Sequence, residues 1–310
     1  GDEAFLPSTT NRMLSLFTFQ QFDLSKDASL RFGGRIEENF IQKKSSSRFG
    51  ASDEVGRINW SASLGHVQNF STNFTFESAL SYTERAPTFQ ELFSDGEHVA
   101  TGTLERGDTS LGKEKSTAVE LILKKISDNH TFTGSIYTQF FNDYIFLSPT
   151  GAVVGGYNEF TYEQVNALFY GVDLANRVRV ATLKKGGLIL LSNFDWVRAK
   201  NTTAGENLPR ISPARLLLGL EYQKETWSAD LSSQYVFHQT KTSPNESATD
   251  DFILTHFNYT YRIVENITSW DLFFSVKNIF DVEARSAVSF LKDVAPLPGR
   301  NFVAGATFQF

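Results

Sequence analysis

The sequence has no cysteine and only one methionine, Met13, in its 310 residues. Without cysteine the chain has no disulfide framework, no thiolate metal site and no cysteine nucleophile. Basic residues are in the minority, because 29 lysines and arginines face 35 acidic residues and leave a formal net charge of −6. Nucleic-acid binding needs a basic face for the phosphates, so we expect no nucleic-acid partner.

Long apolar runs are also missing, since no stretch approaches the ~18–20 residues of a membrane-spanning helix. Membrane-spanning strands stay open, because a transmembrane strand carries a much weaker hydropathy signal than a helix. Aromatic residues, in contrast, are abundant at 14 % of the chain, and 29 of them are phenylalanine. With 41 % hydrophobic and 21 % charged residues, the composition fits an ordered protein rather than a disordered one.

Apolar and polar residues alternate with a period of two along most of the chain. In the stretch 56–66, for example, Ile58, Trp60 and Leu64 alternate with Asn59 and Ser61. This pattern is typical of β-strands with one apolar face, and no stretch shows the period of a helix, so the fold class is all-β. We predict thirteen strands at residues 13–22, 28–38, 56–66, 72–84, 114–125, 131–147, 160–180, 187–199, 214–223, 227–239, 252–263, 268–279 and 301–310.

The predicted connections alternate between short and long. The short ones are 23–27, 67–71, 126–130, 223–226 and 264–267, and the long ones are 39–55, 85–113, 200–213, 240–251 and 280–300. Tight periplasmic turns at one rim and long extracellular loops at the other are typical of an antiparallel transmembrane β-barrel. Trp227 and Trp270 lie beside short turns, where an aromatic girdle would sit. A soluble sandwich or propeller also alternates, but it gives no reason to segregate loop lengths.

The chain ends in an apolar segment, 303–310 (VAGATFQF), with a terminal aromatic residue. This segment resembles the C-terminal assembly signal of bacterial outer-membrane barrels, which places Phe310 at the periplasmic rim. Counting back from there, the strand 13–22 runs inward, and an even-numbered barrel then requires strands upstream of it. In a barrel of about 22 strands, this chain would supply the thirteen C-terminal ones. We therefore expect residues 1–310 to be the C-terminal part of a larger barrel.

Several motifs jointly resemble the TonB-dependent outer-membrane receptors. They are 84–93 (ERAPTFQELF) with 111–116 (LGKEKS), 276–281 (VKNIFD) with 298–302 (PGRNF), 170–173 (YGVD) and 211–215 (ISPAR). The resemblance covers nearly the whole chain. It implies a monomeric transporter in the outer membrane, surrounded by lipid, that imports a scarce ligand with energy from the inner-membrane TonB complex. It also implies an N-terminal plug, absent from these residues, and neither enzymatic activity nor a resident cofactor.

Two segments indicate a branch within this family. The zinc-receptor branch is the one most similar to 4–10 (AFLPSTT), followed by 16–17 (LF), and to 96–103 (GEHVATGT). Heme receptors also place a ligand histidine between the motifs that correspond to 84–93 and 111–116, and His98 lies in that interval. Neutral imidazole binds Zn²⁺ and is also the common ligand of heme iron, so the chemistry permits both. The resemblance makes zinc the first candidate for the imported ligand and heme the second. The resemblance implies His98 as a metal ligand and Glu97 as a second, with the other ligands in the missing plug. An iron-siderophore receptor would leave His98 without a role.

The alternatives outside this family are an enzyme and a passive porin. We find no Ser/His/Asp set that the topology would bring together at one rim, so no enzyme is predicted. Arg85 and Glu91 could suggest a charge relay, but a buried ion pair that anchors the long loop is the simpler interpretation. The other histidines are interpreted as lumen packing (His256), an outer strand end (His238) and short turns (His66 and His130).

Overall fold

The protein is described by a computed structural model over residues 4–183, 186–265 and 267–310. Residue 266 of the predicted turn 264–267 therefore lies outside the described residues. In chain order the elements are β1 (Thr9–Ser25), β2 (Ala28–Lys43), β3 (Asp53–Asn69), β4 (Phe74–Arg85), α1 (Phe89–Phe93), β5 (Asp95–His98), β6 (Thr103–Arg106), β7 (Glu114–Ser127), β8 (His130–Val154), β9 (Tyr157–Leu183), β10 (Gly186–Asn201), β11 (Glu206–Asn207), β12 (Arg215–Lys224), β13 (Trp227–Val236), β14 (Phe252–Glu265), β15 (Thr268–Lys277) and β16 (Asn301–Gln309).

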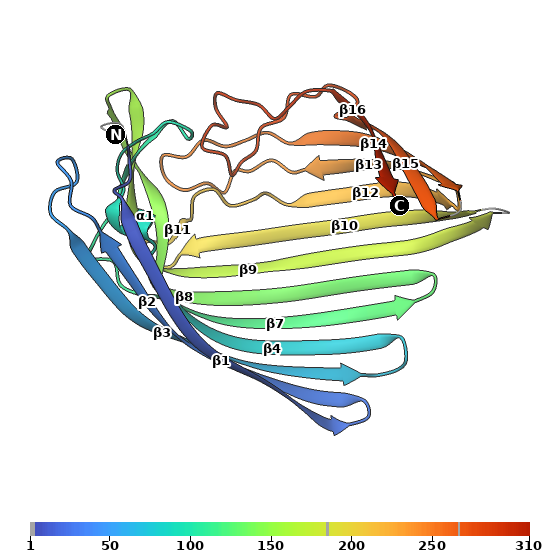
Figure 1. Cartoon of the computed structure of the whole chain (residues 1–310), viewed down its shortest axis with the longest axis horizontal. Helices are drawn as coiled ribbons and strands as arrows, with labels where there is room; N and C mark the ends of the chain where they lie inside the picture. The colour runs from blue at the N-terminus through green and yellow to red at the C-terminus, as the bar shows by residue number, and fades with distance from the viewer. Residues whose placement is uncertain (1–3, 184–185, 266) are drawn as a thin grey trace.

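The long strands form one curved sheet in which each strand pairs with the next one along the chain (Figure 1). Its order is β1-β2-β3-β4-β7-β8-β9-β10-β12-β13-β14-β15-β16, and all of these neighbours are antiparallel. The thirteen predicted strands correspond one to one to this path, which confirms the all-β antiparallel prediction. In the part of the chain that the structure describes, β1 and β16 do not pair with each other, as expected for part of a barrel.

Short and long connections also lie at opposite ends of the sheet, as predicted. Tight turns join β1 to β2, β3 to β4 and β7 to β8 at one end of the sheet, and the long connections gather at the other end (Figure 1). We call these the short-turn end and the long-loop end. The largest connection, between β4 and β7, holds α1, β5 and β6. Among the described residues no helix is long and apolar enough to cross a membrane.

Two strands reach further than the alternation predicts. β8 continues to Val154 and β9 starts at Tyr157, so the interval 148–159 forms a hairpin rather than a loop. Gly155 and Gly156, with φ of 61° and 91°, make its two-residue turn, which requires positive φ at both positions. The prediction stopped short because Pro149 breaks the strand pattern, and the register between β8 and β9 indeed shifts between Pro149 and Val153.

The two faces of the sheet differ in chemistry. Apolar side chains on one face remain open to the surroundings, with Leu218, Leu220 and Leu231 at 50 %, 48 % and 48 % exposure. Polar groups on the other face pair between neighbouring strands, as in the 2.9 Å contact between Arg215 Nε and Asp195 Oδ2. An apolar outer face and a paired, polar inner face are the pattern of a barrel that lies in lipid and encloses a wet lumen.

Aromatic pairs mark two levels along the apolar face. Near the short-turn end, Trp227 contacts Tyr222 with ring centroids 4.9 Å apart, and Trp270 contacts Phe308 at 4.5 Å. Towards the long-loop end the pairs are Trp60 with Tyr82 and Tyr170 with Trp196. Transmembrane barrels carry aromatic girdles at both interfaces, so these two levels fit the two edges of a bilayer.

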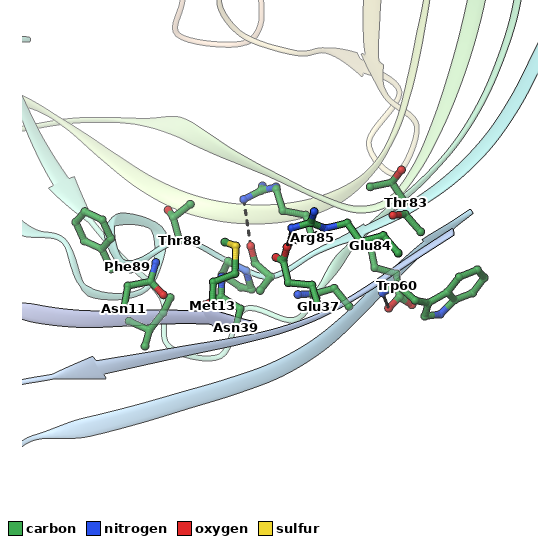
Figure 2. Close-up of a pocket in the computed structure, with 16 residues that line it drawn as sticks. Asn11, Met13, Glu37, Asn39, Trp60, Thr83, Glu84, Arg85, Thr88 and Phe89 are labelled. Atoms are coloured by element: carbon green, nitrogen blue, oxygen red, sulfur yellow. Dashed lines mark hydrogen bonds and ion pairs between the residues drawn. The ribbon is translucent and has the colours of Figure 1, made fainter. Parts of the chain in front are cut away.

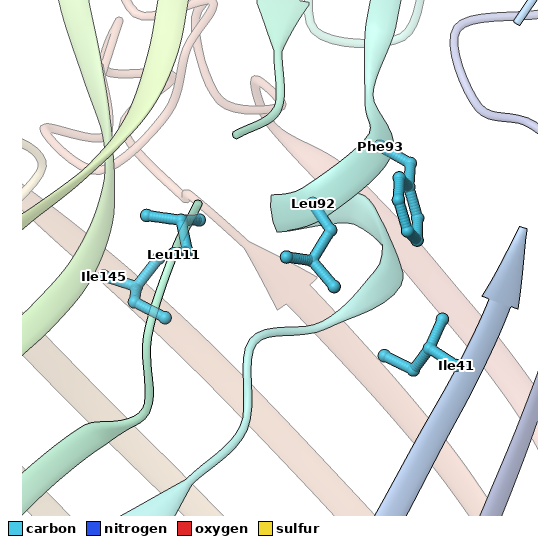
Figure 3. Packing of buried hydrophobic residues seen from close by; sticks show 5 residues of the cluster. All are labelled: Ile41, Leu92, Phe93, Leu111 and Ile145. Atoms are coloured by element: carbon cyan, nitrogen blue, oxygen red, sulfur yellow. The ribbon is translucent and has the colours of Figure 1, made fainter. Parts of the chain in front are cut away.

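Buried apolar clusters lie at the long-loop end. One contains Leu92 and Phe93 of α1, packed with Ile41, Leu111 and Ile145 (Figure 3). A second consists of Ala167, Ala199 and Leu208. These clusters fix the long connections against the sheet, so the loop that contains the predicted ligand residues is an ordered part of the fold.

Candidate metal-binding site

The connection between β4 and β7, here called the 86–113 loop, begins with a capped single-turn helix. Thr88 is the N-cap of α1: its hydroxyl accepts a hydrogen bond from the Glu91 backbone N–H, and the Glu91 carboxylate accepts one from the Thr88 N–H. This reciprocal capping box satisfies two backbone donors that the short helix would leave unpaired. The helix then directs Leu92 and Phe93 into the core cluster, which sets where the following residues lie.

A small hairpin follows α1 and joins the sheet. β5 pairs with β6 in an antiparallel ladder in which His98 stands opposite Thr103. Thr103–Arg106 in turn pairs in parallel with residues 158–161 of β9. The turn between the two strands closes with a hydrogen bond of 3.0 Å from the Gly102 N–H to the His98 carbonyl, and Gly102 has a φ of 65° that favours glycine. The outer extension of β9 therefore determines the position of His98.

His98 lies between a carboxylate and an aromatic ring. Its Nδ1 is 2.7 Å from Oε1 of Glu105, whose side chain is only 2 % exposed. Its ring stacks on Phe5, with centroids 4.2 Å apart and 11° between the planes. The N-terminal segment is held there by a 2.8 Å hydrogen bond from the Asp95 N–H to the Phe5 carbonyl. The structure thus brings together the two segments, 4–10 and 96–103, that carry the resemblance to zinc receptors.

Glu97 precedes His98 on the same strand, and adjacent side chains of a strand point to opposite faces. It is exposed, whereas His98 is partly buried, so the structure does not place the two side chains together. Asp95, at the start of the same strand, forms an ion pair with Arg106. No group of three or more histidine, aspartate or glutamate side chains in the described ranges is arranged to hold a metal ion.

Arg85 anchors the base of the 86–113 loop, as predicted. Its guanidinium lies 2.9 Å from Glu91 Oε2 and 3.0 Å from Glu114 Oε2. The Glu114 carboxylate also accepts a 2.9 Å hydrogen bond from the Ile145 N–H of β8. The structure confirms the interpretation of Arg85 and Glu91 as an ion pair that holds the loop.

The other histidines have structural partners or open surroundings. His256 accepts a hydrogen bond at Nδ1 from the Asn278 N–H at 3.2 Å, which fits its interpretation as packing within the lumen. His130, beside the turn between β7 and β8, contacts Asn176 Oδ1 at 2.7 Å. His238 follows β13 at the long-loop end and is exposed. None of them joins His98.

A cavity of about 460 Å³, lined by both polar and apolar side chains, lies between the inner face of β1 to β4 and the start of the 86–113 loop (Figure 2). Asn59 lines it and is 3 % exposed. Neither polar atom of its amide has a hydrogen-bond partner within the described residues. A buried amide favours a partner that both accepts and donates hydrogen bonds. This cavity could not be predicted from the sequence, because an asparagine on the polar face of a strand is ordinary.

The last three long connections meet at a second polar cluster. The Lys292 ammonium lies 3.0 Å from Glu246 Oε1, and the two side chains are only 6 % and 10 % exposed. Glu246 also accepts a 2.9 Å hydrogen bond from the Arg210 N–H. The Arg210 guanidinium stacks over Phe290 at 4.3 Å, and burial lowers its pKa from the ordinary value. The cluster ties residues 202–214, 237–251 and 278–300 to one another.

The sheet is antiparallel, with an apolar outer face, aromatic girdles and a long loop folded back onto its long-loop end. These features together are typical of the wall of an outer-membrane β-barrel. The family model described as "TonB dependent receptor-like, beta-barrel" matches residues 2–279. The chain belongs to this TonB-dependent receptor family, whose members are outer-membrane transport proteins and not enzymes. The predicted family, fold class and location in the outer membrane are therefore confirmed.

Solved structures agree on the fold. The copper transporter OprC is similar with a TM-score of 0.83 and 20 % identity, over 97 % of this chain and 48 % of that one. The unliganded ferric citrate transporter FecA gives a TM-score of 0.74 at 17 % identity, over 97 % and 45 %. The FrpB iron transporter from Neisseria meningitidis gives 0.69 at 14 %, over 96 % and 45 %. The chain thus spans about half the length of these structures.

Two residues of the site were missed from the sequence. Glu105 follows a region of loop-like composition, where a charged residue is expected to be solvated, yet it is buried in a strand that pairs with β9. Phe5 lies more than ninety positions from His98, so no local pattern links them. The signal that could have found Glu105 is the short alternation Thr103-Leu104-Glu105 after Gly102, which is typical of the second strand of a hairpin.

Proposed function

We propose that this chain is part of a TonB-dependent transporter that actively imports a scarce metal, with zinc as the cargo. The observation that carries the proposal is the His98 imidazole, held by Glu105 and Phe5 in a loop folded back on the sheet. Such a loop is unusually long, and long ordered loops on a rigid scaffold commonly serve binding. His98 is the proposed ligand, and Glu97 is a second candidate to be tested separately.

The composition favours zinc among the metals. Zn²⁺ accepts nitrogen and oxygen ligands from histidine and carboxylates, and a closed site takes about four of them. Thiolate and thioether ligands, which suit Cu(I), are limited here to the single thioether of Met13. We propose that the remaining ligands come from a plug domain outside this chain, so that metal binding stabilises one arrangement of plug and barrel.

The proposed partners follow from the same scheme. We infer that a plug N-terminal to this barrel segment contacts the inner-membrane TonB complex, which supplies the energy for import. Lipid surrounds the apolar face, on which Leu218, Leu220 and Leu231 are exposed. We further propose that the receptor acts as a monomer in a barrel of about 22 strands, without a resident cofactor or a nucleic-acid partner.

Heme is the second candidate cargo, because an imidazole nitrogen is also the common protein ligand of heme iron. Copper is included among the metals to be tested, since OprC is described as a copper transporter. A siderophore would leave His98 without a role, and a passive porin would need no held histidine. These alternatives rank lower for that reason.

The test is uptake by cells that produce the full-length receptor, comparing the wild type with His98→Ala. His238→Ala is the matched control, because that exposed histidine lies at the same end of the barrel. We expect His98→Ala to lose zinc uptake while heme uptake and the control stay unchanged. Loss of heme uptake alone would support the second candidate. Unchanged uptake of zinc, copper and heme would reject His98 as the ligand residue.

A further inference from the structure

Glu105 has every acceptor position occupied. Its Oε1 faces His98 Nδ1 at 2.7 Å and accepts from Thr103 Oγ1 at 3.2 Å. Its Oε2 accepts from Gln90 Nε2 at 3.0 Å and from Tyr162 OH at 3.5 Å. A carboxylate offers about four lone-pair positions, so none remains for an incoming metal ion. With the residue only 1 % exposed, these donors are also what makes burial of the carboxylate tolerable.

This environment determines which nitrogen of His98 carries the proton. An ionised carboxylate only accepts hydrogen bonds, so the Nδ1 of His98 has to donate to Glu105. In the neutral imidazole Nε2 is then the nitrogen with the free lone pair. The stacked Phe5 ring restrains the plane of the imidazole from a second direction. Carboxylate and phenyl ring together fix both the tautomer and the orientation of the histidine.

We propose that Glu105 is the positioning residue of the site: it holds His98 as the Nδ1–H tautomer and leaves Nε2 as the atom that binds the cargo. This inference rests on the proposed function, and it adds a residue that does not touch the cargo. Histidines that bind metals commonly donate their second N–H to a carboxylate. Removing such a partner typically weakens metal affinity by about 10- to 100-fold.

The arrangement separates the roles of the two acidic residues nearest to the histidine. Glu105 shares a face of the hairpin with His98 and has no free lone pair, whereas Glu97 lies on the other face and is exposed. Metal affinity should therefore depend on Glu105 through His98.

Zinc affinity of the purified full-length receptor in detergent, measured by titration calorimetry, tests the inference. The variants are His98→Ala, Glu105→Ala and Glu105→Gln, with Glu163→Gln, at an exposed glutamate of β9, as the matched control. We expect Glu105→Ala to weaken zinc binding about 10- to 100-fold, and the control Glu163→Gln to bind zinc as the wild type does. Glu105→Gln should be intermediate, because its amide oxygen can still accept one hydrogen bond from Nδ1.

A second readout distinguishes positioning from a merely structural role. Histidine-selective ¹⁵N NMR of the metal-free receptor should show His98, assigned by its loss in His98→Ala, as the Nδ1–H tautomer. Glu105→Ala should shift it to a mixture of tautomers, and Glu105→Gln should restore part of the original signal. Unchanged affinity in Glu105→Ala, or weaker affinity with an unchanged tautomer, would overturn the inference. Wild-type zinc affinity in His98→Ala would instead overturn the proposed function.

Discussion

Arg85 and Glu114 face each other where the 86–113 loop leaves and re-enters the sheet. They are register partners at the ends of β4 and β7, and Arg85 Nη2 lies 3.0 Å from Glu114 Oε2. The same guanidinium holds Glu91 of α1. One side chain therefore joins two strand ends to the first helix of the loop, and the hairpin that carries His98 begins directly after this junction.

Replacing Arg85 should loosen the loop without unfolding the barrel. In Arg85→Ala the carboxylates of Glu91 and Glu114 lose their shared cation, and we expect local stability to fall by about 1–3 kcal/mol. Arg85→Lys should recover only part of it, because an ammonium cannot form both paired contacts. The measurement is the rate of proteolysis within the loop of the folded receptor. Cleavage no faster than in the control Arg57→Ala would contradict the anchoring role.

The buried pair of Lys292 and Glu246 should stabilise the cluster of the last three long connections. In Lys292→Met the Glu246 carboxylate stays buried without its cation, and removal of one partner of such a pair typically costs about 3–5 kcal/mol. We expect rapid proteolysis within residues 280–300, and partial recovery in the double variant with Glu246→Gln. Lys241→Met, at an exposed lysine, is the control. Equal cleavage rates in the two lysine variants would show that the pair is dispensable.

Neighbouring positions on β13 should respond in opposite ways to a charge. Leu231 is on the apolar face and 48 % exposed, whereas Ser232 lies on the inner face opposite His256. Leu231→Arg should cost about 2–4 kcal/mol in the bilayer and reduce the amount of folded receptor in the outer membrane. Ser232→Arg should assemble normally. Heat-modifiable mobility on gels measures assembly, and the reverse result would invert the two faces.

The long-loop end should face the exterior of the cell. Because these 310 residues contain no cysteine, single cysteines can be introduced as reporters. Val99→Cys, at a position that is 75 % exposed in the loop, should react with an impermeant maleimide on intact cells. Asp128→Cys, in the turn between β7 and β8, should react only after the outer membrane is opened. Labelling of Asp128→Cys alone on intact cells would contradict this orientation, and the unsubstituted receptor gives the background.

The strands were predictable because one physical rule governs them all. A strand between lipid and a wet lumen must alternate apolar and polar residues, so apolar residues at every second position, such as Leu218 and Leu220, mark each strand in the sequence. Interruptions such as Pro149 and Gly151 hid the hairpin at 148–159, since its continuation depends on pairing between β8 and β9 and not on local alternation. Strand count and order were therefore accessible, whereas the extent of the outer strands was not.

Only part of the candidate site could be predicted from the sequence, for a related reason. His98 could be singled out because a histidine in a particular interval of a known motif pair is distinctive. Glu105 and Phe5 become its partners through the parallel pairing of β6 with β9 and the docking of the N-terminal segment. Contacts of this kind join distant parts of the chain, and no periodicity within either segment predicts them.

The most direct test of the central claim is to see where zinc binds. We would soak crystals of the full-length receptor with Zn²⁺ and collect anomalous diffraction above and below the zinc absorption edge. The account predicts a peak about 2.0–2.1 Å from His98 Nε2, with Nδ1 still in contact with Glu105. Zinc peaks at other positions, with His98 Nε2 unoccupied at saturating zinc, would contradict it.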